Sequence, residues 1–259
     1  MTDALYVGAT GMRAHQTQVD TIANNVANVN TVGFRRETVN FSSVMAALQS
    51  GATDPLGSSL RENLQARGAG AIASLQLSVN GGELKQTEAP LDVAIEGRGF
   101  FEVQLPNGTP AYTRAGALSL DSEGLLTSAG LPLSGHITVP GDANNLRITG
   151  DGRVIANVAN QSDVELGNIE LAAFANPSGL ESIGNNLYRS TGSSGDVQLG
   201  VPGEAGNGVL RQGYLESSNV QLVDELVALM LAQRGFEMNS KVVQAADQMM
   251  SITNGLYRS

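Results

Sequence analysis

Cysteine and tryptophan are absent from the 259-residue chain, and histidine occurs only at His15 and His136. Without cysteine, disulfide frameworks, thiolate zinc sites and cysteine nucleophiles are excluded. His15 lies within a predicted helix, where we interpret it as a packed imidazole, and His136 has no catalytic motif around it. Gly97-Arg98-Gly99 lacks the third glycine of a phosphate-binding loop and is interpreted as a turn between strands. We therefore predict no catalytic, cofactor-binding or metal-binding residue.

Basic residues are also few. Lys and Arg total 15 against 25 Asp and Glu, which gives a formal charge of -10 and opposes binding to nucleic acid or anionic lipid. The longest apolar run, Leu226 to Ala232, is far shorter than the ~20 residues of a membrane-spanning helix. No Lys or Arg precedes Arg13 and no long apolar segment follows, so we expect neither membrane insertion nor a cleaved signal peptide.

Glycine is scarce at the two ends of the chain. Of 31 glycines, 22 lie between Gly81 and Gly213, where they favour turns over helices. The pattern predicts an α+β protein in which terminal helices form a coiled-coil domain with an inserted, mainly-β domain. The predicted segments are an N-terminal helix in 1–40, an extended connection in 41–80, a β-rich outer domain in 81–215 and a C-terminal helix in 216–259.

Apolar residues recur at seven-residue spacing in both terminal segments, which is typical of a coiled-coil seam. Charge is scarce on the first segment, since Arg13 and Asp20 are its only formal charges from Ala4 to Phe34. A helix with so few charges favours protein neighbours on most sides. Two interpretations remain open: the helices pack only within their own domain, or they pair and then pack against copies of the chain. For the second we predict an assembly interface of Leu5, Met12, Val19, Ile22, Val26, Val29, Leu222, Leu226, Leu229, Phe236, Val243 and Met250.

Within the inserted domain, short β-rich runs alternate with turn signals. We predict strands at Leu118–Leu120, Ile137–Val139, Asn145–Thr149, Arg153–Val158, Ile169–Phe174 and Val209–Leu215. Before this domain, the segment from Phe41 to Val79 has no sustained period, and a short helix is predicted only around Val44 to Leu48. At the start of the last helix, Ser217, Ser218 or Asn219 is the predicted N-cap.

The end of the first helix reads Ala23-Asn24-Asn25-Val26-Ala27-Asn28, followed by Thr31-Val32-Gly33-Phe34-Arg35-Arg36. This segment resembles the amino-terminal signature of the bacterial flagellar rod and hook family. The likeness continues through Leu91 to Phe101, Ala111 to Arg114, Gly213 to Val220 and Gln233 to Lys241, and so spans essentially the whole chain. The matched motif residues singled out are Asn24, Asn25, Asn28, Thr31, Gly33, Phe34, Ser218 and Asn219. One departure is Gly235, where the family more often has alanine.

The resemblance implies a non-enzymatic building block of the flagellar drive shaft that polymerises into a hollow helical tube. The length and the segment from Gly179 to Tyr188 are most similar to a distal rod subunit, with a proximal rod subunit as the nearest alternative. It further implies export by the flagellar export apparatus, a location in the periplasm-spanning rod of the basal body, and contacts with proximal rod proteins, hook protein and the P- and L-ring proteins.

Two alternatives outside a rod subunit stay open at this point. An accessory scaffold or cap would differ in copy number. A secreted adhesive or carbohydrate-binding β protein with helical ends would need a pocket of converging acids or aromatic rings. The absence of Trp and an aromatic content of 4% disfavour stacking on sugars.

Overall fold

The computed structural model describes residues 2–43, 71–158 and 161–256. The described residues form two α-helices, one at each end of the chain, with a mainly-β region between them, which confirms the predicted α+β class. They divide into two compact units. The helical unit comprises 2–27, 37–43, 71–76 and 221–256, and the β unit comprises 28–36, 77–158 and 161–220. The predicted helix around Val44 to Leu48 lies outside the described residues.

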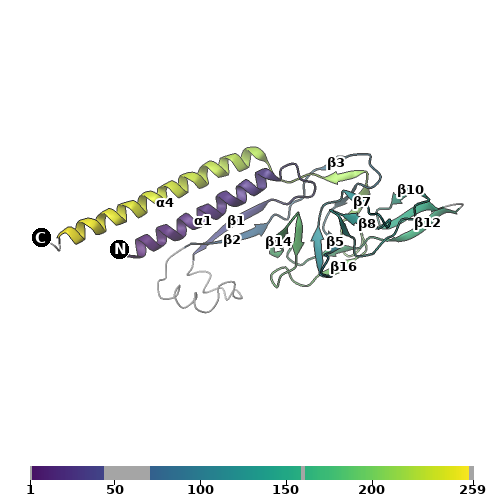
Figure 1. Ribbon diagram of the computed structural model, residues 1–259, viewed down its shortest axis with the longest axis horizontal. Coiled ribbons are helices and arrows are strands. Elements are labelled where there is room, and N and C mark those ends of the chain that lie inside the picture. Colours follow the sequence, from purple (N-terminus) through teal and green to yellow (C-terminus); the bar gives the residue numbers. More distant parts are fainter. Residues whose placement is uncertain (1, 44–70, 159–160, 257–259) are drawn as a thin grey trace. The chain divides into compact units, whose positions relative to one another are not determined.

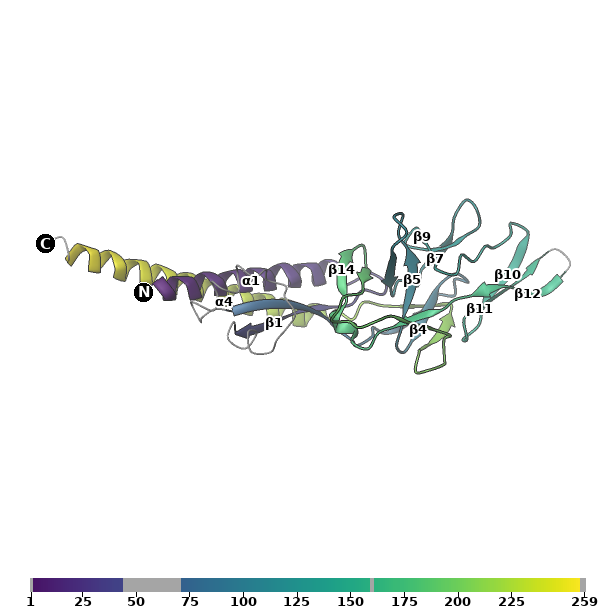
Figure 2. The same ribbon diagram turned by 90° about the horizontal axis from the view of Figure 1, so that it is seen from below.

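The helical unit consists of α1 (Thr2–Ala27), α4 (Leu222–Leu256) and the strands β1 (Glu37–Ser43) and β2 (Ala71–Leu77). In Figure 1 the two helices lie side by side, and the start of α1 is at the same end of the pair as the end of α4. Strand β1 also packs against α1, which Figure 2 shows from the turned view. β1 and β2 form a two-stranded sheet, in which Thr38 bonds Gln76 and Ser74 bonds Asn40. These opposed contacts are those of an antiparallel pair.

The β unit contains one six-stranded sheet with the order β14-β15-β6-β5-β13-β16, and smaller sheets around it. The strands of the large sheet are β5 (Phe100–Gln104), β6 (Pro110–Thr113), β13 (Leu171–Ala173), β14 (Glu181–Gly184), β15 (Leu187–Arg189) and β16 (Gln198–Gly200). The three-stranded sheets are β7 (Leu118–Leu120), β8 (Leu126–Ser128) and β9 (Leu131–Pro132), and β10 (Ala143–Ile148), β11 (Arg153–Val158) and β12 (Gln161–Asn168). Two pairs complete the unit: β17 (Val209–Gln212) with β4 (Val93–Glu96), and β18 (Tyr214–Glu216) with β3 (Leu84–Gln86). One 3₁₀ turn covers Pro177–Gly179.

The central strands of the six-stranded sheet are buried on both faces, whereas the edge strands β14 and β16 are mostly exposed. Successive side chains of a strand point to opposite faces, so neighbours such as Phe100 and Phe101 enter different cores. Phe101 joins an aliphatic cluster with Val93, Leu126 and Leu171. The cluster on the other face is aromatic and contains Leu77, Phe100, Tyr112, Ala172, Phe174, Leu180 and Tyr188. In it the Tyr112 and Phe174 rings meet edge to face with centroids 4.8 Å apart.

The predicted strands at Leu118–Leu120 and Arg153–Val158 are confirmed with the same bounds. The strand predicted at Ile137–Val139 is wrong. That segment lies between His136, which has a φ of 44°, and Pro140, and it contributes only the isolated bridge between Leu125 and Thr138. The single strand predicted from Val209 to Leu215 is divided at Gly213, whose φ is 76°, into β17 and β18.

Candidate functional site

Small residues line the contact between α1 and α4. A Cβ atom added to Gly8 would lie 2.6 Å from Cγ2 of Val243, and one added to Gly11 would lie 2.8 Å from Nδ2 of Asn239. Farther along, a Cβ on Gly235 would lie 2.5 Å from Cε1 of His15. Each glycine therefore accommodates a larger side chain of the facing helix. The helices are antiparallel, because successive contacts move up α1 from Gly8 to His15 and down α4 from Val243 to Gly235. Glycine leaves room for the facing side chain at each of these points, because an added Cβ would force that side chain or the helix to shift.

Only part of the predicted apolar seam of α4 faces α1: Val243 lies against Gly8, whereas Leu222 and Phe236 lie on the outer side of the helix. Leu222, Leu226 and Phe236 are 46%, 47% and 38% exposed. The buried positions of α4 are instead Glu225, Ala232, Gly235 and Ala246. Three of these repeat at or near heptad spacing but begin three residues after Leu222. Because small residues permit the closest approach, that line faces α1 and the larger apolar side chains are displaced outward.

The remaining predicted seam residues lie nearer to the contact. Ile22 is buried, and the others that belong to the helices are half-buried. These half-buried residues are Leu5, Met12, Val19 and Val26 on α1, with Leu229, Val243 and Met250 on α4. Val29 follows the end of α1 and is a half-buried member of the β unit. As an interface between copies of the chain, the whole predicted set stays a prediction.

A large apolar surface lies open on α4. We define the outer face of α4 as Leu222, Val223, Leu226, Val227, Met230, Leu231, Met238, Val242, Met249 and Ile252. The exposed fractions of these side chains range from 46% to 73%. Monomeric proteins rarely expose contiguous apolar patches of this kind, and such patches mark contacts with other proteins.

One end of the helix pair is fixed by polar groups. The Asn25 side chain is 1% exposed, donates to the Glu37 carbonyl at 2.8 Å and accepts from the Glu37 N–H at 3.0 Å. Its amide also donates to Oε2 of Glu225 at 3.3 Å, and Glu225 itself is fully buried. Asn25 thus joins α1, the start of β1 and the first turn of α4. In the same motif, Asn24 is exposed.

The rest of the amino-terminal motif forms a turn within the β unit. Thr31 donates from its backbone N–H to the Asn28 carbonyl and from its hydroxyl to the Asn28 side chain. Gly33 has a φ of 68°, its N–H donates to the Glu216 carbonyl, and a Cβ there would lie 2.4 Å from the Arg114 carbonyl oxygen. Glycine is therefore required for both conformation and space. Phe34 follows as a buried anchor.

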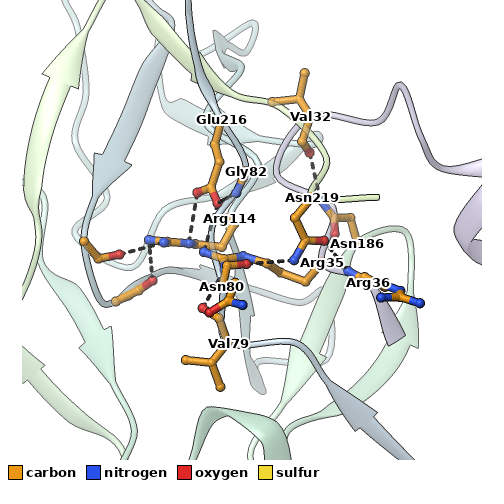
Figure 3. Close-up of polar contacts among 12 residues, drawn as sticks. Val32, Arg35, Arg36, Val79, Asn80, Gly82, Arg114, Asn186, Glu216 and Asn219 are labelled. Atoms are coloured by element: carbon orange, nitrogen blue, oxygen red, sulfur yellow. Dashed lines mark hydrogen bonds and ion pairs between the residues drawn. The ribbon is translucent and has the colours of Figure 1, made fainter. Parts of the chain in front are cut away.

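Next to this turn, two arginines share one buried carboxylate (Figure 3). Arg35 Nη2 lies 2.9 Å from Glu216 Oε1, and Arg114 Nε lies 3.2 Å from Glu216 Oε2. The three side chains are only 3% to 4% exposed. Arg35 also donates to the Val79 carbonyl, while Glu216 accepts from the N–H of Gly82. This buried group of Arg35, Arg114 and Glu216 is named the Glu216 cluster.

Arg114 ties the cluster to the turn between β4 and β5. Its terminal nitrogens donate to the carbonyls of Gly99 at 2.8 Å and Gly97 at 2.7 Å. Burial lowers the pKa of Arg114 to about 10, against the opposing effect of Glu216 and with a smaller lowering by Arg35. Burial likewise lowers the pKa of Arg35, with Glu216 acting in the opposite direction. Gly97-Arg98-Gly99 is thus the predicted turn between strands, and its carbonyls hold a buried cation.

The carboxyl-terminal motif meets the same turn. Asn219 accepts from the Arg36 N–H at 2.6 Å and donates to the Asn80 carbonyl at 2.7 Å. The predicted capping role is therefore wrong for Asn219, because its side chain is engaged here, and α4 begins later, at Leu222. The Ser218 hydroxyl accepts from the Val220 N–H at 3.3 Å. Both side chains bind backbone groups around the turn. The first hydrogen bond of the helix is instead accepted by the Gln221 carbonyl from the Glu225 N–H.

The sequence alone did not predict the residues that hold this junction together. Arg35, Arg114 and Glu216 each stand in a motif that the family likeness covers, but their pairing joins positions far apart in the chain. Asn186 was missed as well: it donates to the Val32 carbonyl at 2.9 Å. The sequence does contain one indication of this cluster: in three separate motifs a charged residue, Arg or Glu, stands beside apolar and small residues, which is typical of a buried ion pair.

Within the described residues, no cluster of three or more metal-ligating acidic or histidine side chains occurs. None of the helices in the described part of the chain is both long and apolar enough to cross a membrane.

Three family models match the chain in succession. They are described as flagella basal body rod protein over residues 5–35, flagellar hook protein FlgE/F/G D1 domain over residues 94–156, and flagellar basal body rod FlgEFG protein C-terminal over residues 211–256. The flagellar basal-body rod protein FlgG of Borreliella burgdorferi is 41% identical over 100% of both chains. The chain belongs to the flagellar basal-body rod protein family.

Other relatives agree with this membership. The flagellar basal-body rod protein FlgG of Caulobacter vibrioides is 40% identical and covers 98% of both chains. The flagellar hook-basal body complex protein FlhP of Bacillus subtilis is 27% identical over 99% of this chain. Each of the three matched regions contains one residue of the Glu216 cluster: the first ends at Arg35, the second contains Arg114, and the third contains Glu216. The Glu216 cluster therefore joins one residue from each matched region.

Proposed function

We propose that this chain is a structural subunit of the distal part of the flagellar rod, the drive shaft that carries torque to the hook. The observation that carries the proposal is its full-length similarity, at about 40% identity, to proteins named flagellar basal-body rod protein FlgG. The subunit acts by assembling, and it catalyses no reaction. Proximal rod proteins, hook protein and the P- and L-ring proteins are its proposed neighbours, and the flagellar export apparatus is its route to the periplasm-spanning rod.

The outer face of α4 supports a role in self-assembly. Burying apolar surface contributes about 25 cal/mol per Å², and the side chains of this face from Leu222 to Val242 are 46% to 73% exposed. We place this face, which includes the predicted seam residues Leu222 and Leu226, against helices of neighbouring copies, together with Phe236. The coiled coil predicted from the heptads would then be completed between copies and not within one. A contact of this heterologous, non-closing kind produces a helical tube.

A position elsewhere in the hook–basal body is the second candidate. It is supported by the similarity to the hook-basal body complex protein FlhP of Bacillus subtilis, at 27% identity. The lower identity of that relative favours the distal rod.

Electron microscopy of purified basal bodies in which this chain is tagged tests the proposal. We expect label along the distal rod, between the proximal rod and the hook, in many copies per particle. Label confined to the proximal rod, or a stoichiometry of only a few copies, would support the second candidate and contradict the first. Basal bodies with no label would contradict both.

A further inference from the structure

A small cavity of about 50 Å³ lies in the β unit beside the Glu216 cluster. Three arginines line it, namely Arg35, Arg98 and Arg114, and Phe100, Phe174 and Pro177 are among the apolar residues of its wall. A single water requires roughly 10 to 15 Å³ of such space. The cavity is therefore large enough for a few waters or for one carboxylate group. We name it the arginine cavity.

Positive charge in the arginine cavity exceeds the negative charge that faces it. Glu216 is the one carboxylate that pairs with Arg35 and Arg114. Arg98 makes no ion pair within the described residues, and its guanidinium only approaches the Phe174 carbonyl at 3.5 Å. Three guanidinium groups thus have one carboxylate among the described residues. An anion that entered the cavity would be attracted by two uncompensated charges.

Buried hydrogen-bonding capacity is also left over at this place. The Arg35 side chain is only 4% exposed, and its Nε has no hydrogen-bond partner among the residues described. Buried donors without partners are rare and are generally satisfied by water or a ligand.

From this geometry we propose that the arginine cavity binds a carboxylate carried by an Asp or Glu side chain of a second copy of the chain. Guanidinium groups match carboxylates by paired N–H···O bonds, and they do so best where water is excluded. Charge complementarity identifies the occupant, since residues 81–215 carry 15 acidic and 7 basic side chains and a neighbouring copy presents many carboxylates. A cavity on one copy and an acidic side chain elsewhere on the next make a heterologous contact. The choice of a second copy rests on the proposed function, whereas anion binding by the cavity does not.

The first experiment tests the cavity in the full chain, with acetate as the carboxylate probe. Sodium acetate replaces sodium chloride at constant ionic strength while the amide resonances of Gly97 and Gly99 are followed by nuclear magnetic resonance. We expect saturable shifts in the wild-type chain and at least a tenfold weaker response in Arg98→Gln. Arg147→Gln is the matched control, because Arg147 is an exposed arginine of β10 that pairs with Asp163. Absence of a saturable shift, or an equal response of Arg98→Gln, would overturn the cavity as an anion site.

The second experiment identifies the source of the carboxylate. Val79 lines the cavity with an exposed side chain, so a benzophenone amino acid at this position leaves the arginines in place. Polymers are formed from a mixture of light and isotopically heavy copies, irradiated and digested. We expect cross-links between light and heavy copies that join position 79 to a peptide containing Asp or Glu.

The two experiments fail in different ways. Polymers that bind acetate but give no cross-link between copies at position 79 would overturn the second copy as the occupant. A chain that forms no polymer contradicts the proposed function, and the acetate titration then still decides whether the cavity binds anions. In polymers, Arg98→Glu is expected to raise the concentration needed for assembly about tenfold relative to Arg147→Glu, which corresponds to about 1.4 kcal/mol. Equal thresholds for the two variants would also contradict the proposal.

Discussion

Gly235 of α4 lies directly against the imidazole of His15 on α1, so that a Cβ at position 235 would be 2.5 Å from Cε1 and 2.6 Å from Nε2 of the ring. Helix α4 continues through this glycine without interruption. His15 also contacts Phe41, with ring centroids 5.7 Å apart, and Gln18 through Nδ1. A glycine that departs from the family pattern therefore has a steric reason: it makes space for a histidine on the facing helix.

Gly235→Ala is expected to destabilise the helix pair. On an exposed helix this change gains up to about 1 kcal/mol from helix propensity, but here overpacking against His15 costs about 1 to 3 kcal/mol. Urea unfolding of the full chain, followed by its helical circular dichroism, measures the balance. In the His15→Ala background the steric conflict is removed, so adding Gly235→Ala should no longer lower the unfolding free energy. If Gly235→Ala alone stabilised the helices, the close contact would be refuted.

Glu216→Gln is expected to lower the free energy of unfolding of the β unit by about 3 to 5 kcal/mol, because it leaves two buried guanidinium groups without a counter-charge. The matched control is Glu96→Gln, which removes the carboxylate of an exposed pair with Arg211. That change should cost less than about 1 kcal/mol. Chemical denaturation followed by tyrosine fluorescence compares the two. Equal losses would show that the Glu216 cluster does not hold the β unit together.

Asn25→Leu tests the polar end of the helix pair. The variant places an apolar side chain of similar size at this position and leaves the N–H and carbonyl of Glu37 without their present partners. Each unsatisfied buried group costs about 1 to 3 kcal/mol. We expect a fall in helical stability of that order, measured by hydrogen exchange of the α1 amides, whereas Asn30→Ala at an exposed position of the same motif should change little. Unchanged exchange in Asn25→Leu would remove this role.

Alkaline pH provides a test of the aromatic core. Burial, followed by the nearby Glu102 carboxylate, raises the pKa of Tyr112 above its ordinary value of 10.0. The folded chain therefore retains a proton that the unfolded chain loses, so the contribution of Tyr112 is fully present below pH 10 and is lost as the pH rises through the folded pKa. The difference in unfolding free energy between the wild type and Tyr112→Phe should be constant from pH 7 to 9 and decrease above pH 10. A difference that stays constant to pH 11.5 would contradict the raised pKa.

Local patterns in the sequence predicted much of the fold. Glycine distribution separated helical ends from a β middle, and the strands at Leu118–Leu120 and Arg153–Val158 follow from alternation between turn residues. The orientation of α4 did not follow from its heptads. Two seams three residues apart coexist in that helix, one of large apolar residues from Leu222 and one from Glu225 that includes Ala232 and Ala246. Which seam faces α1 depends on Gly8 and Gly11 of the partner helix, and periodicity within one segment carries no such information.

The polar junction was predictable in its parts and not in its pairing. The Asn, Gly and Phe residues of the amino-terminal motif were recognised, and Gly33 has the positive φ that favours glycine. The Glu216 cluster, by contrast, joins positions 35, 114 and 216 through long-range strand pairing, which a single sequence does not specify. The predicted cap at Ser217, Ser218 or Asn219 is wrong because α4 begins only at Leu222, and a distant backbone N–H, that of Arg36, binds the Asn219 side chain.

We propose that the outer face of α4 binds other copies of the chain. Sedimentation and electron microscopy of Leu226→Asp with Met230→Asp, both on that face, test it against Gln161→Asp with Gln198→Asp, which adds the same charge at exposed polar positions of the β unit. We predict tubes from the wild type and the control, and monomers with an intact β unit from the first variant. Tubes of normal length from Leu226→Asp with Met230→Asp would contradict the claim.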